Sequence, residues 1–355
     1  MNSKNLIAHR LTNQKLAPHE SMAVSELVSW MAAIQAQEYA SAKWALGLRL
    51  PGLKDSDIEN AFNGGEIIRT HVLRPTWHFV SPKDIRWMLE LTAPRIKAIS
   101  SYMFRKSELN EKIFKRSNAR IMQVLRGGNH LTRSNLQEEL AKVKIFSDGQ
   151  RLSYLMMVAE LDGIICSGRR RGNQFTYALL EDRVPRVKSL HREEALAELT
   201  KRYFNSHGPA TLKDFSTWSG LSMIDAKNGM SMVTSKFKRE KIEGEEYYFS
   251  HDSAEKSLHV DKRMLLLPTY DELIMGYKNR NAIVAQCNRH IPELVFNSIV
   301  LLNGYAAGTR RRVSEKKNNL IEIKPWNTFA CADALALKKA LKEYENFTGI
   351  KTVLI

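Results

Sequence analysis

The feature of this sequence that most constrains its fold is a plan that occurs three times: a helix, a turn, a second helix, then a strand or hairpin. The middle copy is the clearest. It places Thr132 as an N-cap before a helix that carries Leu136 and Leu140 on one face, and a second apolar helix follows over residues 151–161. Two β-prone arms then complete the copy. This order of elements predicts a winged helix.

The hairpin of the middle copy has an unusual tip. Its arms, Ile164–Ser167 and Asn173–Leu179, are joined by two glycines that enclose Arg169, Arg170 and Arg171. Glycine permits a tight turn, and arginine side chains bind phosphates or enter a minor groove. The alternative is an ordinary solvated turn with no ligand.

The third copy repeats these signals. Thr211 is its expected N-cap, Phe215 and Trp218 form the inner face of its first helix, and Ser219-Gly220 makes the turn. A second helix and a wing strand, residues 246–250, follow. The first copy is the N-terminal segment, with helices within residues 21–36 and 54–65 and one strand over residues 67–80.

From about Asp261 the predicted secondary structure changes to strands and a closing helix, residues 331–347. The predicted fold is therefore mainly α with small β-sheets. It comprises three tandem winged-helix domains and a C-terminal α+β, β-rich domain, and we place them at residues 1–100, 101–190, 191–260 and 261–355.

Charge and motifs narrow the function. The formal net charge of +16 favours binding to a polyanion, although lysines that only maintain solubility would give the same balance. Cys166, Cys287 and Cys331 are too widely spaced for a disulfide scaffold or a zinc finger. There is no apolar leader or 18-residue apolar run, which predicts a cytoplasmic protein with no membrane contact. No metal or nucleotide motif is present, so no cofactor is expected.

The triplet Gln35-Ala36-Gln37 follows an amphipathic helix. On a helix its two glutamines would face about 200° apart, whereas in extended backbone they would share a face. If the helix ends near Ile34, Ala36 points into the fold and both amides converge on one water molecule. The alternative is a pair of surface glutamines at a helix end.

Four segments, in order, resemble the bacterial winged-helix DNA glycosylases of the AlkZ and YcaQ type: "IQAQEYASAKWALGLR", "IIRTHVLRPTWHFVSPKDIRWML", "HGPATLKDFSTWSGL" and "LPTYDELIMGYKNR". The resemblance spans nearly the whole chain and implies a C-shaped array. It also implies excision of bulky or cross-linked N-alkylated bases, N7-alkylguanine above all. The family's catalytic signature, Gln-x-Gln or Gln-x-Asp, matches Gln35 and Gln37. Its DNA-contacting hairpin corresponds to the arginine tip, Arg169, Arg170 and Arg171.

Two neutral amides suit this chemistry. An N7-alkylguanine is already cationic, so its glycosidic bond breaks with little acid help. Glutamine carbonyls can orient a water molecule and stabilise nearby positive charge, but they cannot deprotonate it. Uracil, which is neutral, should therefore be a poor substrate. No lysine is singled out for a Schiff base, so no lyase activity is expected.

Three further residues are weaker site candidates. Asp271 and Glu272 follow a predicted strand, where functional carboxylates are common, and a salt bridge to Lys278 or Arg280 is the simpler account. His78 either contacts DNA or the site, or it is a hydrogen-bonded strand histidine.

Together these features predict a monomeric, monofunctional DNA glycosylase of the bacterial cytoplasm, associated with the nucleoid. Its partner would be double-stranded DNA that carries alkylated bases, including interstrand cross-links. One rival is a non-enzymatic winged-helix DNA-binding protein or transcription regulator, which usually dimerises on a palindrome. Another is an inactive damage binder, which would bind alkylated duplex and release no base.

Overall fold

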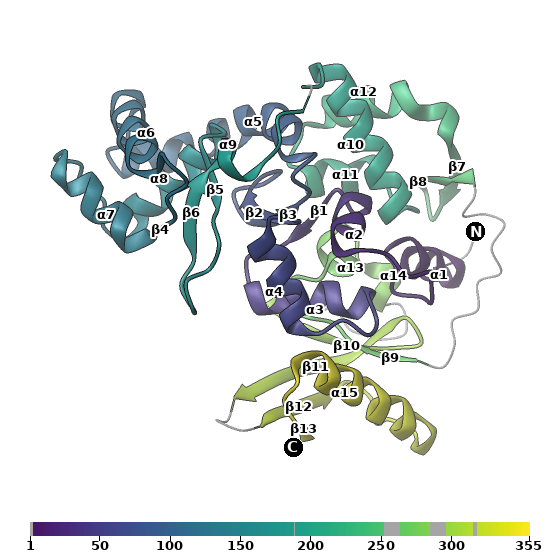
Figure 1. Ribbon diagram of the computed structural model, residues 1–355. Coiled ribbons are helices and arrows are strands. Elements are labelled where there is room, and N and C mark those ends of the chain that lie inside the picture. The colour runs from purple at the N-terminus through teal and green to yellow at the C-terminus, as the bar shows by residue number, and fades with distance from the viewer. Residues whose placement is uncertain (1–2, 188, 252–262, 285–295, 315–317) are drawn as a thin grey trace.

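The computed structural model describes residues 3–187, 189–251, 263–284, 296–314 and 318–355. As expected, the protein is mainly helical with small sheets (Figure 1). Three sheets have only two or three strands, and a fourth, near the C-terminus, has five. None of the described helices is long and apolar enough to cross a membrane. The chain begins with α1 (Ser3–Asn13), which packs against α10 and α14.

We call the segments that carry the three predicted copies of the plan the first, second and third repeats, and their elements are given below. The first repeat has a three-stranded sheet of order β1-β3-β2. Its elements are α2 (Val24–Trp30), β1 (Ala33–Gln35), α3 (Tyr39–Arg49), α4 (Asp55–Gly64), β2 (Ile68–His71) and β3 (Trp77–Val80). The helix before the glutamine triplet ends before Gln35, as the expectation required, but it ends at Trp30 and not near Ile34. Ala32 has a φ of +63°, a left-handed conformation that cannot continue a right-handed helix. Gln35 therefore lies in a strand.

The single strand expected over residues 67–80 is also wrong. The segment forms two antiparallel strands, in which His71 pairs with Trp77 and Thr70 pairs with His78. Leu73 has a φ of +63° and Pro75 follows it, so the backbone turns back on itself between the two histidines. As a result, residues 72–76 form a loop beside the end of β1.

The second repeat has the sheet order β4-β6-β5, which matches the first. Its elements are α5 (Ile85–Lys106), α6 (Glu111–Leu125), β4 (Leu131–Thr132), α7 (Arg133–Lys142), α8 (Gly149–Leu161), β5 (Ile165–Ser167), β6 (Thr176–Leu179) and α9 (Leu180–Arg183). The predicted cap is confirmed, since the Thr132 hydroxyl accepts a hydrogen bond from the N–H of Asn135. Leu136 and Leu140 are fully buried, as expected. The boundary predicted at residues 100 and 101 falls inside α5.

The third repeat contains α10 (Arg192–His207), α11 (Leu212–Ser219), α12 (Met223–Val233), β7 (Phe237–Ile242) and β8 (Glu245–Ser250). Thr211 caps α11, and Phe215 and Trp218 are fully buried, as predicted. The predicted turn is confirmed at Gly220. Its φ is +71°, and an added Cβ would lie 2.2 Å from the carbonyl oxygen of Leu73, so only glycine fits.

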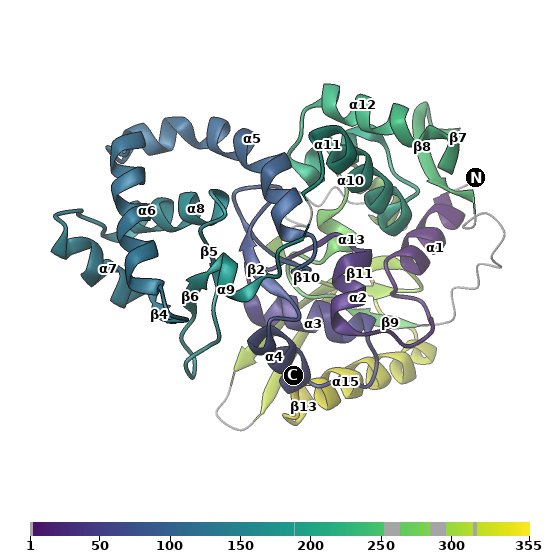
Figure 2. The same ribbon diagram turned by 45° about the horizontal axis from the view of Figure 1, so that its top comes forward.

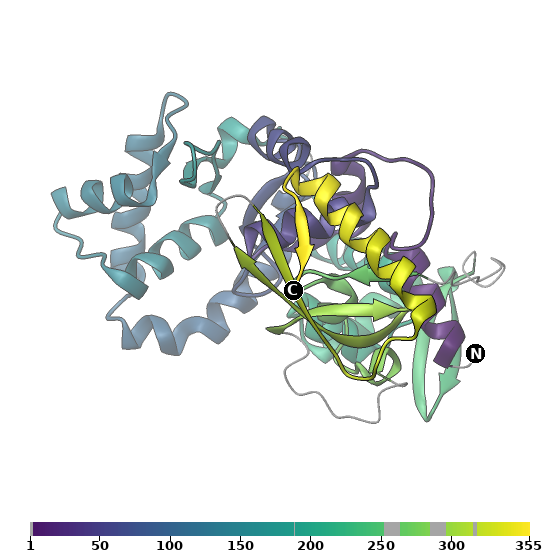
Figure 3. The same cartoon turned by 90° about the horizontal axis from the view of Figure 1, so that it is seen from below.

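The predicted strands and closing helix of the C-terminal region are present. Five strands form a sheet of order β13-β12-β11-β10-β9. The elements are β9 (Met264–Leu266), α13 (Glu272–Met275), α14 (Asn281–Val284), β10 (Ser298–Leu302), β11 (Tyr305–Ser314), β12 (Asn319–Pro325), α15 (Ala334–Thr348) and β13 (Thr352–Leu354). α15 lies along this sheet (Figure 3) and joins it to the first repeat, because Trp44 of α3 packs on Tyr344 and Phe347.

Candidate functional site

Gln35 ends β1, and Gln37 follows it after a fully buried Ala36. The Oε1 atom of Gln35 accepts a hydrogen bond from the hydroxyl of Thr76 at 3.2 Å. The Oε1 atom of Gln37 accepts one from the backbone N–H of Trp77, at 3.4 Å. The two amides therefore reach adjacent residues, and Ala36 points into the fold as expected. Gln35 is buried and Gln37 is exposed, so the pair extends from the protein interior to the surface.

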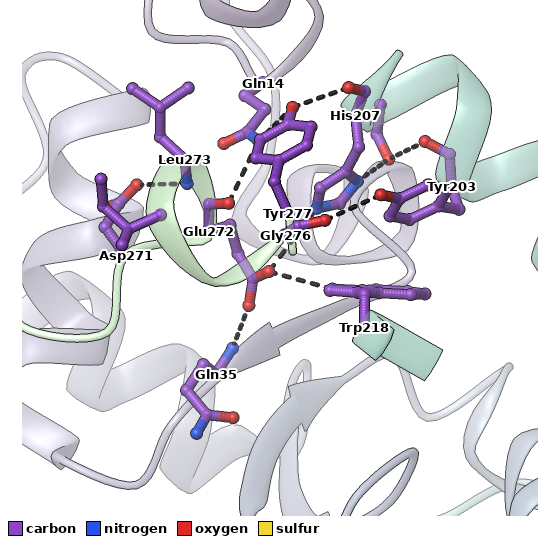
Figure 4. A network of polar contacts seen from close by, with 12 residues as sticks. Gln14, Gln35, Tyr203, His207, Trp218, Asp271, Glu272, Leu273, Gly276 and Tyr277 are labelled. Atoms are coloured by element: carbon purple, nitrogen blue, oxygen red, sulfur yellow. Dashed lines mark hydrogen bonds and ion pairs between the residues drawn. The ribbon is translucent and has the colours of Figure 1, made fainter. Parts of the chain in front are cut away.

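The backbone of this segment is held by a carboxylate from the C-terminal region (Figure 4). The N–H of Ala36 donates to Trp77 on β3, so the N–H of Gln35 points to the open edge of the sheet. There it donates to Oε1 of Glu272 at 2.6 Å. The other oxygen of Glu272 accepts a hydrogen bond from the indole N–H of Trp218 at 3.0 Å. The side chain of Glu272 on α13 thus satisfies the backbone N–H that Gln35 presents at the open edge of the first sheet.

Glu272 is fully buried but charged. Burial alone would raise the pKa of its carboxyl group, but the contact with His207, the nearby charge of Arg74 and the N–H of Gln35 lower that pKa to about 2. Nε2 of His207 lies 3.5 Å from the carboxylate, and burial lowers the pKa of His207. The carboxylate of Glu272 is therefore ionised at neutral pH, and burial disfavours the charged form of His207 beside it.

Asp271 has a different partner from those expected. Its carboxylate forms two 2.8 Å hydrogen bonds with the guanidinium of Arg49, and both side chains are fully buried. The predicted salt bridge from this acidic pair to Lys278 or Arg280 is wrong. The guanidinium of Arg280 instead donates to the carbonyl of Ile274. The acidic pair therefore joins α13 to the first repeat through α3 and β1.

His78 is completely buried beside the glutamine pair, and it pairs with Gln35 across β1 and β3. Its Nδ1 lies 2.9 Å from the carbonyl oxygen of Thr76, and its Nε2 lies 3.4 Å from the guanidinium of Arg74. Burial, with the charge of Arg74, lowers the pKa of His78 to about 3. It is therefore a neutral, hydrogen-bonded strand histidine at physiological pH.

The structure separates the three hairpin arginines. Arg169 and Arg171 are exposed, whereas Arg170 is docked on the first repeat. The backbone N–H of Arg170 donates to the side chain of Asn63 at 2.8 Å, and its guanidinium lies 3.4 Å from Glu59. Figure 2 shows the hairpin beside α4, which carries both of these partners. Arg169 and Arg171 stay exposed, and the guanidinium of Arg171 donates to the carbonyl of His130 at 3.1 Å.

A cationic cleft of about 480 Å³ opens where α3 begins, just after Gln37. Its cations are Arg310, Arg311, Arg312 and Lys324, and its aromatic walls include Trp44, Tyr344 and Phe296. Residues 315–317, which follow β11, lie outside the described residues. In the described part of the chain, no three His, Cys, Asp or Glu side chains are grouped to hold a metal ion.

The sequence of the chain was also compared with models of known protein families, and the result agrees with this arrangement of paired amides, a basic hairpin and a cationic cleft. Residues 28–347 match the model of the family described as DNA glycosylase AlkZ-like. The chain belongs to the AlkZ-like DNA glycosylase family. The resemblance seen in the four sequence segments is thereby confirmed over most of the chain.

One curated relative of this AlkZ-like chain is the interstrand DNA cross-link repair glycosylase of Streptomyces sahachiroi. It is 26% identical over 227 residues, which cover 62% of this chain and 61% of the relative, so the match spans less than two thirds of that protein. The solved structure of S. sahachiroi DNA glycosylase AlkZ has the same fold, with a TM-score of 0.81 and 18% identity over the whole of both chains.

Sequence reasoning missed Arg69, which lies beside the glutamine pair. Arg69 of β2 is buried, and its guanidinium contacts the backbone of the glutamine triplet. A lone arginine in a β-prone segment gives no local signal. Arg69 and His71 are two residues apart, and alternate side chains of a strand lie on the same face. This spacing was the only available hint in the sequence.

Proposed function

We propose that this chain is a monofunctional DNA glycosylase that hydrolyses the N-glycosidic bond of N-alkylated purines, N7-alkylguanine above all. Purines joined in an interstrand cross-link are included in this substrate class. The single observation that carries the proposal is the placement of the Gln35 and Gln37 amides against adjacent residues, Thr76 and Trp77. Family membership supports the same reaction.

The proposed chemistry relies on positioning and electrostatics. Each amide oxygen has two lone pairs, and the contacts with Thr76 and Trp77 use one lone pair on Gln35 and one on Gln37. The second lone pair of each can accept a hydrogen bond from a water molecule held between them. The same carbonyl dipoles favour the positive charge that develops on the sugar as the cationic base leaves. No strong base is required.

The lysine nearest in sequence to the glutamine pair is Lys43. Its contacts are consistent with base release without strand cleavage. A Schiff base would require a free amine next to C1′. Lys43 is buried, and its ammonium group lies 2.6 Å from Asp55 and 2.8 Å from Glu59. Two carboxylates therefore engage this group in ion pairs, so it is not a free amine.

The proposed substrate gives the fold a role. We infer that the three repeats are winged helices and that they form a C-shaped, basic surface for a duplex, on which a monomer acts. The shared element order and the matching sheet orders of the first two repeats support this inference. The exposed Arg169 and Arg171 would contact the phosphate backbone, and a chromosomal substrate places the protein at the nucleoid.

The test uses a duplex that contains N7-methylguanine, followed by alkaline cleavage of abasic sites. Wild-type protein should release the base, and Gln37→Ala and Gln35→Ala should lose release while they retain duplex affinity. Gln123→Ala is the matched control, because Gln123 is an exposed amide on α6. Binding without base release by the wild type would instead favour a damage binder or a regulator, and a strong consensus sequence in a binding selection would decide for the regulator.

A further inference from the structure

Arg69 is buried between the first repeat and the hairpin of the second. Its Nε donates to the carbonyl of Ala36 at 2.9 Å, and its Nη2 lies 3.4 Å from the carbonyl oxygen of Gln37. These carbonyls belong to successive peptide groups of the glutamine triplet. A planar guanidinium that contacts both fixes the orientation of those peptides, and hence the directions in which the two amide side chains leave the backbone.

The same guanidinium stacks on two aromatic rings from different repeats. Its central carbon lies 4.4 Å from the ring centre of Trp77, whose backbone N–H donates to Gln37, and 4.7 Å from that of Phe175. Phe175 lies in the returning arm of the hairpin, directly before β6. Arg69 therefore touches the glutamine segment and the hairpin at once.

The stack continues through the hairpin to α3. The guanidinium of Arg170 lies 4.9 Å from the ring of Phe175 and 5.1 Å from the ring of Tyr39, and these two rings meet edge to face at 4.9 Å. Tyr39 begins α3, two residues after Gln37. Alternating cations and aromatic rings thus lie next to the glutamine segment at both of its ends. Cation–π contacts are strongest when they are removed from water.

We propose that Arg69 is a positioning residue that couples the Gln35–Gln37 segment to the arginine hairpin, so that base excision requires the hairpin to be docked. The proposal rests on the glycosylase function above. Arg170 then belongs to this coupling, whereas Arg169 and Arg171 remain exposed. A hairpin displaced from the stack would release Phe175 from Arg69, and the carbonyls of Ala36 and Gln37 would lose their fixed partner.

The kinetic test compares Arg69→Lys, Phe175→Leu and the double variant. Lysine keeps the charge but cannot contact two carbonyls and stack on two rings. Each single variant should slow single-turnover excision about 10- to 100-fold, with duplex affinity within about threefold of the wild type. The double variant should be much less impaired than the product of the two single effects. Phe114→Leu is the matched control, since Phe114 packs on Phe104 away from the stack.

A second readout does not depend on activity. Hydrogen exchange of the peptide that spans residues 33–39 should become faster in Arg69→Lys and in Phe175→Leu, and should stay unchanged in Phe114→Leu. Unchanged exchange in both stack variants, or rate effects that multiply independently, would overturn the coupling. If the wild type released no base, the glycosylase function would fail, and the exchange experiment would still decide whether the stack holds the glutamine segment.

Discussion

The carboxylate of Glu272 accepts a 2.6 Å hydrogen bond from the backbone N–H of Gln35, a residue 237 positions away in the chain. Through this contact, the C-terminal region holds the backbone at one end of the glutamine pair in place. Because Trp218 of the third repeat donates to the same carboxylate, three distant segments meet at one charged group. A change at this buried group should therefore affect both stability and base excision.

The first prediction concerns Glu272→Gln. Two N–H donors face the two carboxylate oxygens, whereas an amide offers one acceptor and places an NH₂ group against the other donor. The variant should lose about 2–4 kcal/mol of unfolding free energy in urea titrations, and excision should also slow. Glu111→Gln, at an exposed ion pair with Lys115, should leave the unfolding midpoint unchanged. Equal midpoints for the two variants would contradict the role of Glu272.

The second prediction concerns the pH dependence of excision. Glutamine amides do not titrate, and His78 stays neutral because its pKa is about 3. Single-turnover rates on N7-methylguanine at saturating protein should therefore be flat from about pH 5.5 to about pH 8. A rate that rises with an apparent pKa near 6 or 7 would point to an ionisable general base and against the two-amide mechanism.

The third prediction separates the hairpin arginines. Arg169→Ala and Arg171→Ala should each weaken duplex binding and reduce the magnitude of the log–log salt slope by about one, since each exposed guanidinium releases about one counterion. Arg170→Ala should leave that slope unchanged and slow excision, because Glu59 and two aromatic rings hold this side chain. Fluorescence anisotropy over a range of salt concentrations measures the duplex affinity and its salt slope, and the single-turnover assay measures excision. Equal slopes for all four proteins would show that the hairpin does not contact phosphates.

The fourth prediction concerns acid stability. The pKa of His78 is about 3 in the folded protein and 6.5 ordinarily, so the unfolded chain binds more protons between these values. The stabilisation is present above 6.5 and is lost as the pH falls toward 3. From about pH 7 to about pH 5, the free energy of unfolding should fall by roughly 2 kcal/mol from this group alone.

Urea unfolding at both pH values measures this loss, and the lowered pKa of His207 adds to it in the same direction. A His78→Gln variant should be less stable at neutral pH and should show a weaker dependence on pH. A wild-type midpoint that is the same at both pH values would contradict a buried, neutral histidine at this position.

The sequence by itself determined the features that depend on neighbours along the chain. The caps at Thr132 and Thr211 and the turn at Gly220 follow from side chains within three residues, or from a backbone conformation that glycine alone tolerates. Four local segments were also enough to indicate the family. Such signals involve few residues, so they do not depend on how the repeats are packed.

Only the tertiary structure decided which distant residues meet. The pairing of Asp271 with Arg49, the contact of Glu272 with Gln35 and the contact of Arg69 with the hairpin join residues about 100 to more than 200 positions apart. Burial makes these partners obligatory, because a charge or N–H removed from water must find a compensating group. Which group is nearest depends on the packing of whole domains, and nothing in the local sequence records that choice.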